Sequence, residues 1–278
     1  MSSAKTLFEQ TKEISPNFER ELLKLFNESN GPEKAKPVSD ASTASVHLNP
    51  ESNAVLINFS NFRGPAAHAI WLLKTKEVST TPRGLPVAAK WAIFNSNGHD
   101  NTDEIVGNNQ LIIRAGRGCP LRGTEIPIQP GNRKGKGITQ VLTPPACGIN
   151  KGNDTDNPGF CGIYGIAAAV YVYDKRLENG RGRGSGSDLG DLSSEDLKKW
   201  SNFMKNIKSD AADSDGSAQQ LAFHTMEQLK EWDRKRNTPA VIKSIADKIQ
   251  QLMTVEADKK AEAEAAAGAG GGATGDGG

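Results

Sequence analysis

The sequence predicts an α+β fold, and three observations support this class. An amphipathic helix follows the N-terminus, short apolar segments fill the middle, and the last third carries apolar residues at helical spacing. We therefore expect an N-terminal helical arm, a mixed central region with short strands and long loops, a helical C-terminal third and a disordered tail. The expected segments are an arm at 1–31, a linker at 32–52, a central core at 53–190, helices at 191–260 and a tail at 261–278.

The N-terminal helix has clear start and stop signals. Ser15 supplies an N-cap and Pro16 suits the first turn, whereas glycine and proline at 31–32 end the helix. The following residues are rich in Lys, Pro, Ser, Ala and Thr, which is typical of a mobile linker. We expect the helix to be an arm that packs outside its own domain, with packing inside the chain left open. Its apolar stripe comprises Phe18, Leu22, Leu25 and Phe26.

The central region contains several apolar segments, and not all of them specify one secondary structure. We expect strands at 55–59, 111–114 and 138–142, because each segment is short and aliphatic. Residues 65–74 predict a buried helix opened by proline, and residues 86–94 fit a strand or a helix equally. The last two strands bracket a long basic segment, which would make that segment a hairpin or an excursion from a sheet edge.

Three helices are expected in the C-terminal third. Ser193 caps the first, the Ser217-x-x-Gln220 pattern is a capping box for the second, and the Thr238-Pro239 step opens the third. Beyond residue 261 the chain turns to alanine and then to nearly pure glycine. Such a segment buries too little apolar area to offset the entropy of ordering it, so we expect it to be disordered.

The composition sets limits on the function. The chain has 278 residues, 36% of them hydrophobic and 24% charged, with a formal net charge of +1. Affinity for a polyanion therefore has to come from the distribution of charge rather than from its total. The three cysteines, Cys119, Cys147 and Cys161, are too few for a disulfide scaffold and suit a reducing compartment. Without a signal-peptide core or an apolar run of about 20 residues, we expect a cytoplasmic protein with no membrane association.

Two cationic segments stand out in this charge-balanced chain. Residues 114–137 carry several cations against a single acid, Glu125, and their glycines and prolines prevent a helix. Residues 175–183 repeat the alternation of arginine with glycine. Glycine lets the backbone approach phosphates, and Arg-Gly segments hold single strands without sequence preference. The alternative is two unrelated solvated loops. The predicted RNA contacts are Arg114, Arg117, Arg122, Arg133, Lys134, Lys136, Lys175, Arg176, Arg181 and Arg183.

The N-terminal helix, the two cationic segments and the tail together resemble the organisation of RNA-virus coat or nucleocapsid proteins. No sequence motif carries this resemblance, so no residue roles transfer from it. It implies a structural protein, cytoplasmic or in a virion, that packages single-stranded RNA through phosphate contacts and self-assembles into homo-oligomers. The apolar stripes at 18–26 and 241–252 would then serve subunit contacts, with packing inside the chain as the alternative. The favoured interpretation is a non-enzymatic protein without a cofactor.

Cys161 supports a competing interpretation, a cysteine-nucleophile hydrolase. It follows a Pro-Gly turn and precedes an apolar run, and a helix starting there would stabilise its thiolate. The base would be His68, His99 or His224. If residues 171–173 instead belong to a buried strand, the cysteine is an ordinary small hydrophobe. A helical adaptor protein is a third interpretation.

Two other candidate sites have weak sequence support. The GNRKGKG segment at 131–137 lacks the spacing of a phosphate-binding loop, since its last lysine is followed by glycine. No pair of cysteines or histidines has the spacing of a structural zinc site. The polar residues at 99–104 are more typical of a solvated loop. We therefore expect no metal site.

Overall fold

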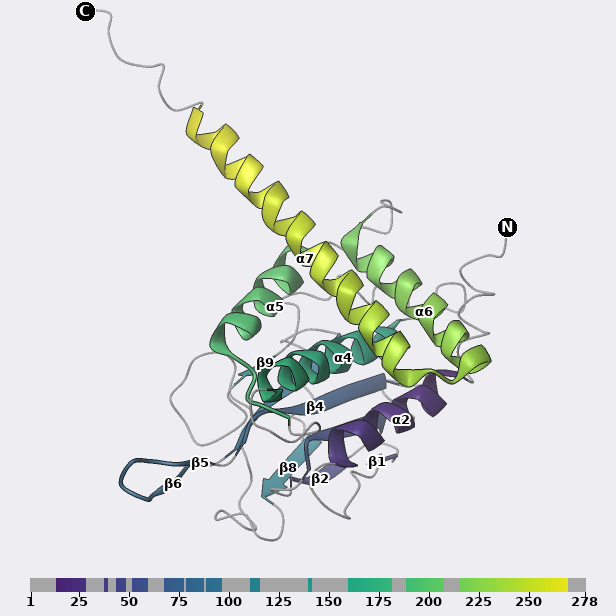
Figure 1. The fold of residues 1–278 in the computed structure, drawn as a ribbon, viewed down its shortest axis with the longest axis vertical. Coiled ribbons are helices and arrows are strands. Elements are labelled where there is room, and N and C mark those ends of the chain that lie inside the picture. Colours follow the sequence, from purple (N-terminus) through teal and green to yellow (C-terminus); the bar gives the residue numbers. More distant parts are fainter. Residues whose placement is uncertain are drawn as a thin grey trace, which may run out of the picture.

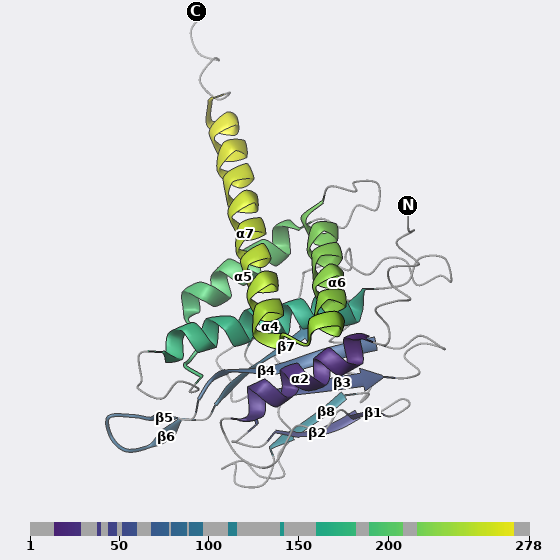
Figure 2. The ribbon, with the colours of Figure 1, turned by 45° about the vertical axis from the view of Figure 1, so that its right-hand side comes forward.

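The structure, a computed structural model, has the α+β architecture that the sequence predicts. Helices gather on one side of a five-stranded sheet, and a small two-stranded sheet lies on the other side (Figures 1 and 2). The described residues are 14–28, 38–39, 44–48, 52–59, 68–77, 79–87, 89–96, 111–115, 140–141, 160–181, 189–207 and 216–269.

The main sheet has an antiparallel centre and parallel edges. Its strands, in order across the sheet, are β1 (Val38–Ser39), β3 (Ala54–Phe59), β4 (His68–Lys76), β7 (Lys90–Asn95) and β9 (Gln140–Val141). β4 pairs antiparallel with both β3 and β7, whereas β1 joins β3 and β9 joins β7 in parallel. Every residue of β4 except the last is buried, so the side chains on both faces of this strand are covered.

The register brings the start of β4 and the end of β7 together. His68 is the first residue of β4 and lies opposite Phe59 of β3. Asn95 is the last residue of β7 and lies opposite Ile70 of β4. His68 and Asn95 therefore sit diagonally across two neighbouring strands, at one end of the sheet.

The helix predicted for residues 65–74 is wrong over 68–74, which belongs to β4, and residues 65–67 lie outside the described residues. Its apolar residues do not alternate with polar ones, a pattern that fits a buried helix or a strand buried on both faces. The structure also resolves the ambiguity at 86–94, which holds β6 (Pro86–Val87) and most of β7. β6 pairs with β5 (Ser79–Thr80) in a hairpin that projects from the fold (Figure 1).

The strands predicted at 55–59, 111–114 and 138–142 are confirmed, but the hairpin between the last two is wrong. β8 (Leu111–Ala115) pairs in parallel with β2 (Ala44–Leu48), whereas β9 belongs to the main sheet. The two strands around the basic segment therefore lie in different sheets. The alternative, an excursion from a sheet edge, fits β9, which is an edge strand.

The N-terminal helix α2 (Ile14–Glu28) packs within its own chain. Its apolar residues Phe18, Leu22 and Phe26 are fully buried in the main core. The Phe18 ring meets the Trp232 ring edge to face, with 5.4 Å between their centroids. For this stripe, packing inside the chain is thus the alternative that the structure supports, and the predicted arm is anchored to the body of the protein.

The three predicted C-terminal helices are confirmed, as α5 (Ser194–Asn206), α6 (Ser217–Lys235) and α7 (Thr238–Ala269). Ser193 caps α5 as predicted, since its hydroxyl accepts a hydrogen bond of 3.0 Å from the backbone N–H of Asp196. Ser217 is the first residue of α6 rather than its N-cap, so the predicted capping box is wrong. Its hydroxyl instead donates to the Glu256 carboxylate on α7.

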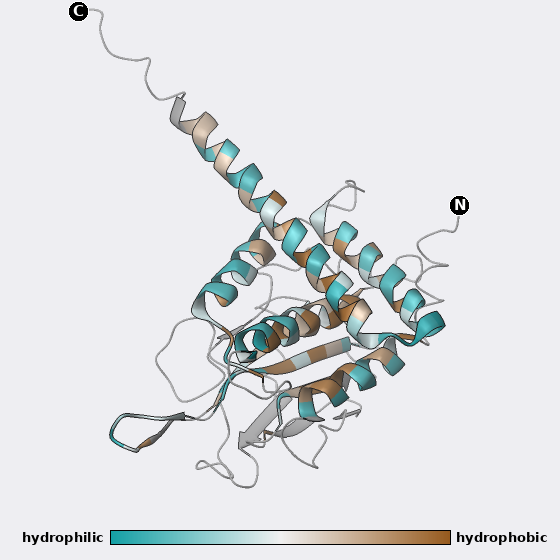
Figure 3. Ribbon diagram, in the orientation of Figure 1, coloured by the Kyte–Doolittle hydropathy of each residue, from teal (hydrophilic) through white to brown (hydrophobic). Residues whose placement is uncertain are grey.

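Helix α7 continues into the segment predicted to be disordered. Its apolar stripe at 241–252 is buried, and the residues beyond it lose most of their contacts but stay helical to Ala269. Alanine has the highest helix propensity, so an alanine-rich segment can extend an existing helix. Disorder is therefore wrong for 261–269, while 270–278 lies outside the described residues. This part of α7 projects from the fold and is mostly hydrophilic or pale, whereas β4 is mostly hydrophobic (Figure 3).

Helix α4 (Cys161–Gly180) occupies the centre of the core, so the strand alternative for 171–173 is wrong. It packs against β4, α2, α6 and α7. Gly165 allows the close approach to the sheet, because a Cβ at this position would lie 2.7 Å from Cδ1 of Trp71. No helix in the described part of the chain is both long and apolar enough to cross a bilayer.

Candidate active site at the start of helix α4

Cys161 is the first residue of α4, directly after the N-cap residue Phe160. The first N–H groups of a helix have no partner within it, and the helix dipole adds partial positive charge there. The nearby backbone N–H groups of Ala69 and Gly162 lower the pKa of the Cys161 thiol. Cys161 is partly exposed. The thiol therefore lies beside backbone donors and is accessible to solvent.

The protonation of Cys161 follows from its surroundings. Burial raises the pKa of the thiol, the N–H groups of Ala69 and Gly162 lower it, and the charge of Glu19 raises it again. The net shift is upward, so the thiol is protonated at neutral pH. The dipole-stabilised thiolate that the sequence suggests is therefore not the resting form. A nucleophile in this state needs a base that accepts its proton during attack.

His68, the first histidine candidate, is a buried residue of β4. Its Nε2 lies 2.8 Å from Oδ1 of Asn95, and both side chains are buried. An amide oxygen only accepts hydrogen bonds, so Nε2 carries the proton in this contact. Burial lowers the pKa of His68 to about 4, against the opposing effect of the Asn95 hydrogen bond. The imidazole is therefore neutral at pH 7.

The thiol and the imidazole lie on opposite faces of the main sheet. Ala69 and Trp71 of β4 face α4, and successive side chains of a strand point to opposite faces. His68 and its partner Asn95 therefore lie on the face away from α4. The structure does not bring this candidate base to the Cys161 thiol.

Glu19 adds a carboxyl group to this site. It lies on α2, is buried, and forms no hydrogen bond or ion pair with the described residues. A Cβ built on Gly162 would be 3.7 Å from Oε1 of Glu19 and 3.9 Å from Oγ of Ser15. The carboxyl group therefore lies over the first turn of α4. Burial raises its pKa to about 8, so it is largely neutral at pH 7.

Sequence reasoning missed Glu19 at this site. A signal was present, because Glu19, Leu22 and Phe26 follow the i, i+3, i+7 spacing of one helix face. A carboxylate at that spacing belongs to the buried stripe.

Arg176 is a correction to the predicted set of RNA contacts. It is fully buried on α4, so it cannot reach a phosphate from the surface. Its guanidinium donates to the carbonyl oxygens of Gly190 at 2.6 Å and Lys74 at 2.9 Å, and it pairs with the Glu77 carboxylate. These contacts tie α4 to β4 and to the segment that precedes α5. The role of Arg176 is therefore structural.

The other predicted RNA contacts fall into two groups. Lys175 lies on α4 and pairs with Glu178 at 2.8 Å, and Arg181 follows the helix as an exposed residue. Arg114 is in β8, where the structure describes the backbone but not the side chain. The remaining predicted contacts lie outside the described residues: Arg117, Arg122, Arg133, Lys134, Lys136 and Arg183. A groove shared by both cationic segments stays a prediction.

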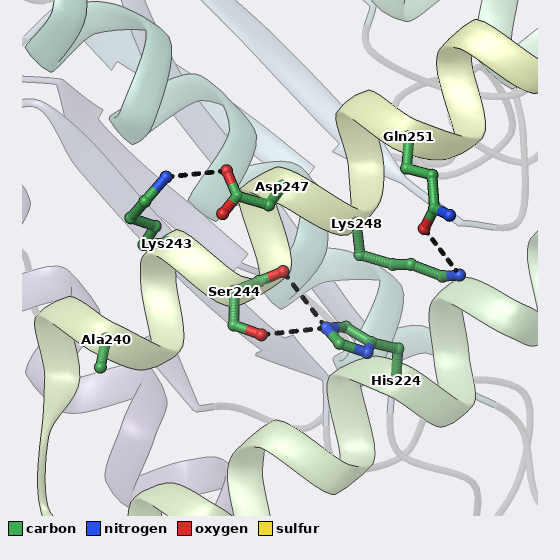
Figure 4. A pocket seen from close by; sticks show the side chains of 7 residues that line it. All are labelled: His224, Ala240, Lys243, Ser244, Asp247, Lys248 and Gln251. Atoms are coloured by element: carbon green, nitrogen blue, oxygen red, sulfur yellow. Dashed lines mark hydrogen bonds and ion pairs between the residues drawn. The ribbon is translucent and has the colours of Figure 1, made fainter.

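His224, the second histidine candidate, lies between α6 and α7 (Figure 4). Its Nε2 is 3.2 Å from Oγ of Ser244 and 3.2 Å from the Ser244 carbonyl oxygen. Ser244 lies inside α7, where the neighbouring backbone N–H groups are used by the helix. The pair therefore lacks donors for an oxyanion, and we interpret it as a contact between two helices. His99, the third candidate, lies outside the described residues.

The comparisons with known proteins identify no relative of this chain. The chain matches no protein-family model, no curated protein and no solved structure. Within the described ranges, no three His, Cys, Asp or Glu side chains cluster closely enough to hold a metal ion. The functional argument therefore rests on the Cys161 site itself.

Proposed function

We propose that this protein is a cysteine-nucleophile hydrolase that acts by acyl transfer. The observation that carries the proposal is the partly exposed Cys161 thiol at the first residue of α4, where backbone N–H groups of Ala69 and Gly162 oppose the effect of burial on its pKa. Cys161 is the nucleophile, and the proposed base is His99, the histidine candidate that lies outside the described residues. The substrate class is a carboxylic ester or amide, since these groups react with a thiol through a tetrahedral intermediate.

The reaction begins with a protonated thiol. The base takes the thiol proton as the sulfur attacks the carbonyl carbon, and the C=O electrons move onto oxygen. When the oxyanion re-forms the carbonyl, the bond to the leaving group breaks and the protonated base returns the proton to that group. A water molecule then attacks the thioester, with the same base accepting its proton, and releases the acid and the free thiol.

This proposal favours the enzymatic alternative over a structural RNA-binding protein. Two described features reduce support for the RNA-binding interpretation: α2 is anchored to the core, and Arg176 is buried. Binding of single-stranded RNA by the other cations remains a prediction. Its signature would be an affinity that falls steeply with salt, because phosphate contacts release counterions.

The test measures reaction of the full chain with p-nitrophenyl acetate. We expect a burst of p-nitrophenolate stoichiometric with protein, and peptide mapping that finds the acetyl group on Cys161. Cys161→Ser should abolish the burst, and His99→Gln should slow it on the order of 10²-fold or more. His224→Gln is the matched control and should leave the burst unchanged.

Circular dichroism establishes the fold of each variant before the kinetics are compared. The proposal fails if folded wild-type protein reacts at Cys161 only in denaturant, or if folded His99→Gln gives the same burst as wild type.

A further inference from the structure

The turn between α6 and α7 contains an arginine in a backbone conformation that side chains disfavour. Arg236 follows α6 with a φ of 53° and a ψ of 26°, in the left-handed region. Within the described ranges it is the only residue other than glycine with a positive φ. Glycine or asparagine usually occupies this position after a helix, because a larger side chain is strained there. Residues held in such conformations concentrate at functional sites.

The Arg236 side chain is held against an aromatic ring. Its guanidinium carbon lies 4.5 Å from the centroid of the Trp232 ring, a cation–π contact. The indole is itself fixed, because its Nε1 donates to Oγ1 of Thr238 at 2.9 Å and the Phe18 ring packs against it edge to face. Nη2 of Arg236 donates to Oδ1 of Asp233 at 2.8 Å. The guanidinium is therefore preorganised, and its remaining N–H donors can bind a ligand.

A pocket of about 610 Å³ lies beside this stacked arginine, and its size suits a small molecule. It forms where α2 meets the turn between α6 and α7 (Figures 1 and 2). A second guanidinium, that of Arg20 on α2, borders the same pocket. Arg20 is positioned within its own helix, since it donates to the carbonyl oxygen of Pro16 at 3.2 Å and to Oδ1 of Asn17. The lining residues are Asn17, Arg20, Glu21, Trp232, Arg236 and Thr238.

Two guanidiniums at one pocket suit an oxyanion with two negative charges. A guanidinium binds phosphate oxygens through parallel N–H donors, and a phosphate monoester carries nearly two negative charges at pH 7. Thr238, the first residue of α7, also borders the pocket, and the dipole of this helix adds partial positive charge there. The Glu21 carboxylate opposes these charges, but it can accept a hydrogen bond from a hydroxyl group of the ligand.

We propose that this pocket binds a small phosphate monoester, with the phosphate between Arg20 and Arg236 and a ligand hydroxyl group at Glu21. The site is separate from Cys161 and does not depend on the proposed hydrolase activity. Phosphate binding also gives a physical reason for an arginine at a position that favours glycine. An Arg236 that only covered the Trp232 ring would form the same stacked contact without any affinity for phosphate.

The variant Arg236→Gly separates ligand binding from folding. Glycine relieves the left-handed backbone, so we expect a stability close to that of wild type in urea denaturation. Calorimetric titration of the full chain with glycerol 3-phosphate should show binding at a single site. Arg236→Gly and Arg20→Gln should each weaken it on the order of 10-fold or more, since each loses a charge-assisted pair. The matched control is Arg234→Gln, at an exposed position of α6 outside the pocket lining, and it should bind as wild type.

Glu21→Leu tests where the ester lies in the pocket. Inorganic sulfate has two negative charges but no hydroxyl group, so it does not donate to Glu21. Loss of the carboxylate removes the same repulsion for both anions, whereas only glycerol 3-phosphate loses an acceptor. We therefore expect the preference for glycerol 3-phosphate over sulfate to fall in Glu21→Leu. An unchanged preference would contradict the contact at Glu21.

The proposal is wrong if wild type does not bind glycerol 3-phosphate at millimolar concentrations, or if folded Arg236→Gly binds it as tightly as wild type. Single-stranded RNA without terminal phosphates contains only phosphate diesters. If the two arginine variants lose affinity for this RNA but not for glycerol 3-phosphate, the pocket belongs to an RNA-binding surface and the monoester assignment is wrong. The burst of Cys161 acylation tests the hydrolase proposal independently of all these results.

Discussion

The two ends of helix α4 both contain buried ionisable side chains, but only one end neutralises them. At the carboxyl end, the Arg176 guanidinium donates to two backbone carbonyls, an amide oxygen and the Glu77 carboxylate. At the amino end, the Glu19 carboxyl has no such partner among the described residues, but its oxygens are not fully enclosed. One helix thus has a hydrogen-bonded cluster at one end and a carboxyl open to a further partner at the other.

This difference separates a structural role from a chemical one. A buried charge is tolerated when it is paired and fully hydrogen-bonded, and such a network locks the elements that supply the partners. Arg176 meets this condition and holds α4, β4 and the segment before α5 together. An unsatisfied group makes no such contribution to the fold. Its hydrogen-bonding capacity is available to a substrate, which is what the amino end requires as an active site.

The largest expected effect comes from breaking the satisfied end. Arg176→Met removes the cation and leaves Glu77 and several carbonyl oxygens without their donor. We expect a loss of about 3–5 kcal/mol in the free energy of unfolding, measured by urea denaturation. Lys175→Met is the control, because an ion pair at the surface contributes about 0–1 kcal/mol.

RNA binding by the same two variants tests whether Arg176 is instead a surface contact. If Arg176→Met keeps wild-type stability but weakens binding to single-stranded RNA, Arg176 is a surface contact after all and the contrast between the ends disappears.

A smaller effect with the opposite sign is expected at the unsatisfied end. The folded-state pKa of Glu19 is raised to about 8 from 4.5, so the folded protein resists losing this proton. Stability from Glu19 is therefore complete below pH 4.5 and is lost progressively as the pH rises to about 8. Glu19→Gln cannot ionise and should stabilise the protein by roughly 3 kcal/mol at pH 7, an effect that vanishes near pH 4.

Thermal unfolding of wild type and Glu19→Gln across this pH range measures the effect, with Glu21→Gln as the control. A constant difference between wild type and Glu19→Gln at every pH would mean that Glu19 does not titrate within the fold. The unsatisfied end would then be defined by Cys161 alone.

The smallest expected effect comes from the middle of α4, which couples both ends to the sheet. A Cβ at Gly165 would lie 2.7 Å from Trp71 Cδ1, so Gly165→Ala should push the helix from β4 and cost about 1–3 kcal/mol. Acylation at Cys161 should slow as well, because the sulfur moves from the Ala69 N–H. At Gly162, a Cβ meets Glu19 at 3.7 Å, an ordinary contact, so Gly162→Ala should fold normally. Equal stability losses at both glycines would show that the Trp71 contact is not the constraint.

Prediction from sequence succeeded where one local pattern suffices. The α5, α6 and α7 helices carry apolar residues at helical spacing, and Ser193 begins the first with a hydroxyl cap. The prediction failed at 65–74, because a segment buried on both faces shows no alternation of apolar and polar residues. It failed at 261–269 as well, where the outcome depended on whether an existing helix could be extended.

The candidate site was only half visible in the sequence. Cys161 at the start of a helix, with three possible histidine bases, could be proposed from residue types and turn signals. The exclusion of His68 could not, because it depends on which face of β4 packs against α4. Arg176 was misassigned for the same reason, since its partners at 53, 74, 77 and 190 are distant in sequence.

The sequence by itself determined the α+β class, the helical C-terminal third and a cysteine at the start of a helix, because these follow from local spacing and capping. Only the tertiary structure decided which charges are neutralised and which are left to act. Burial and partnering are properties of neighbours in space, and they set the pKa of Glu19, His68 and Cys161 through desolvation and hydrogen bonding. Arg176 therefore has a structural role, whereas Glu19, which the sequence analysis did not single out, lies beside the first turn of α4 at the candidate site.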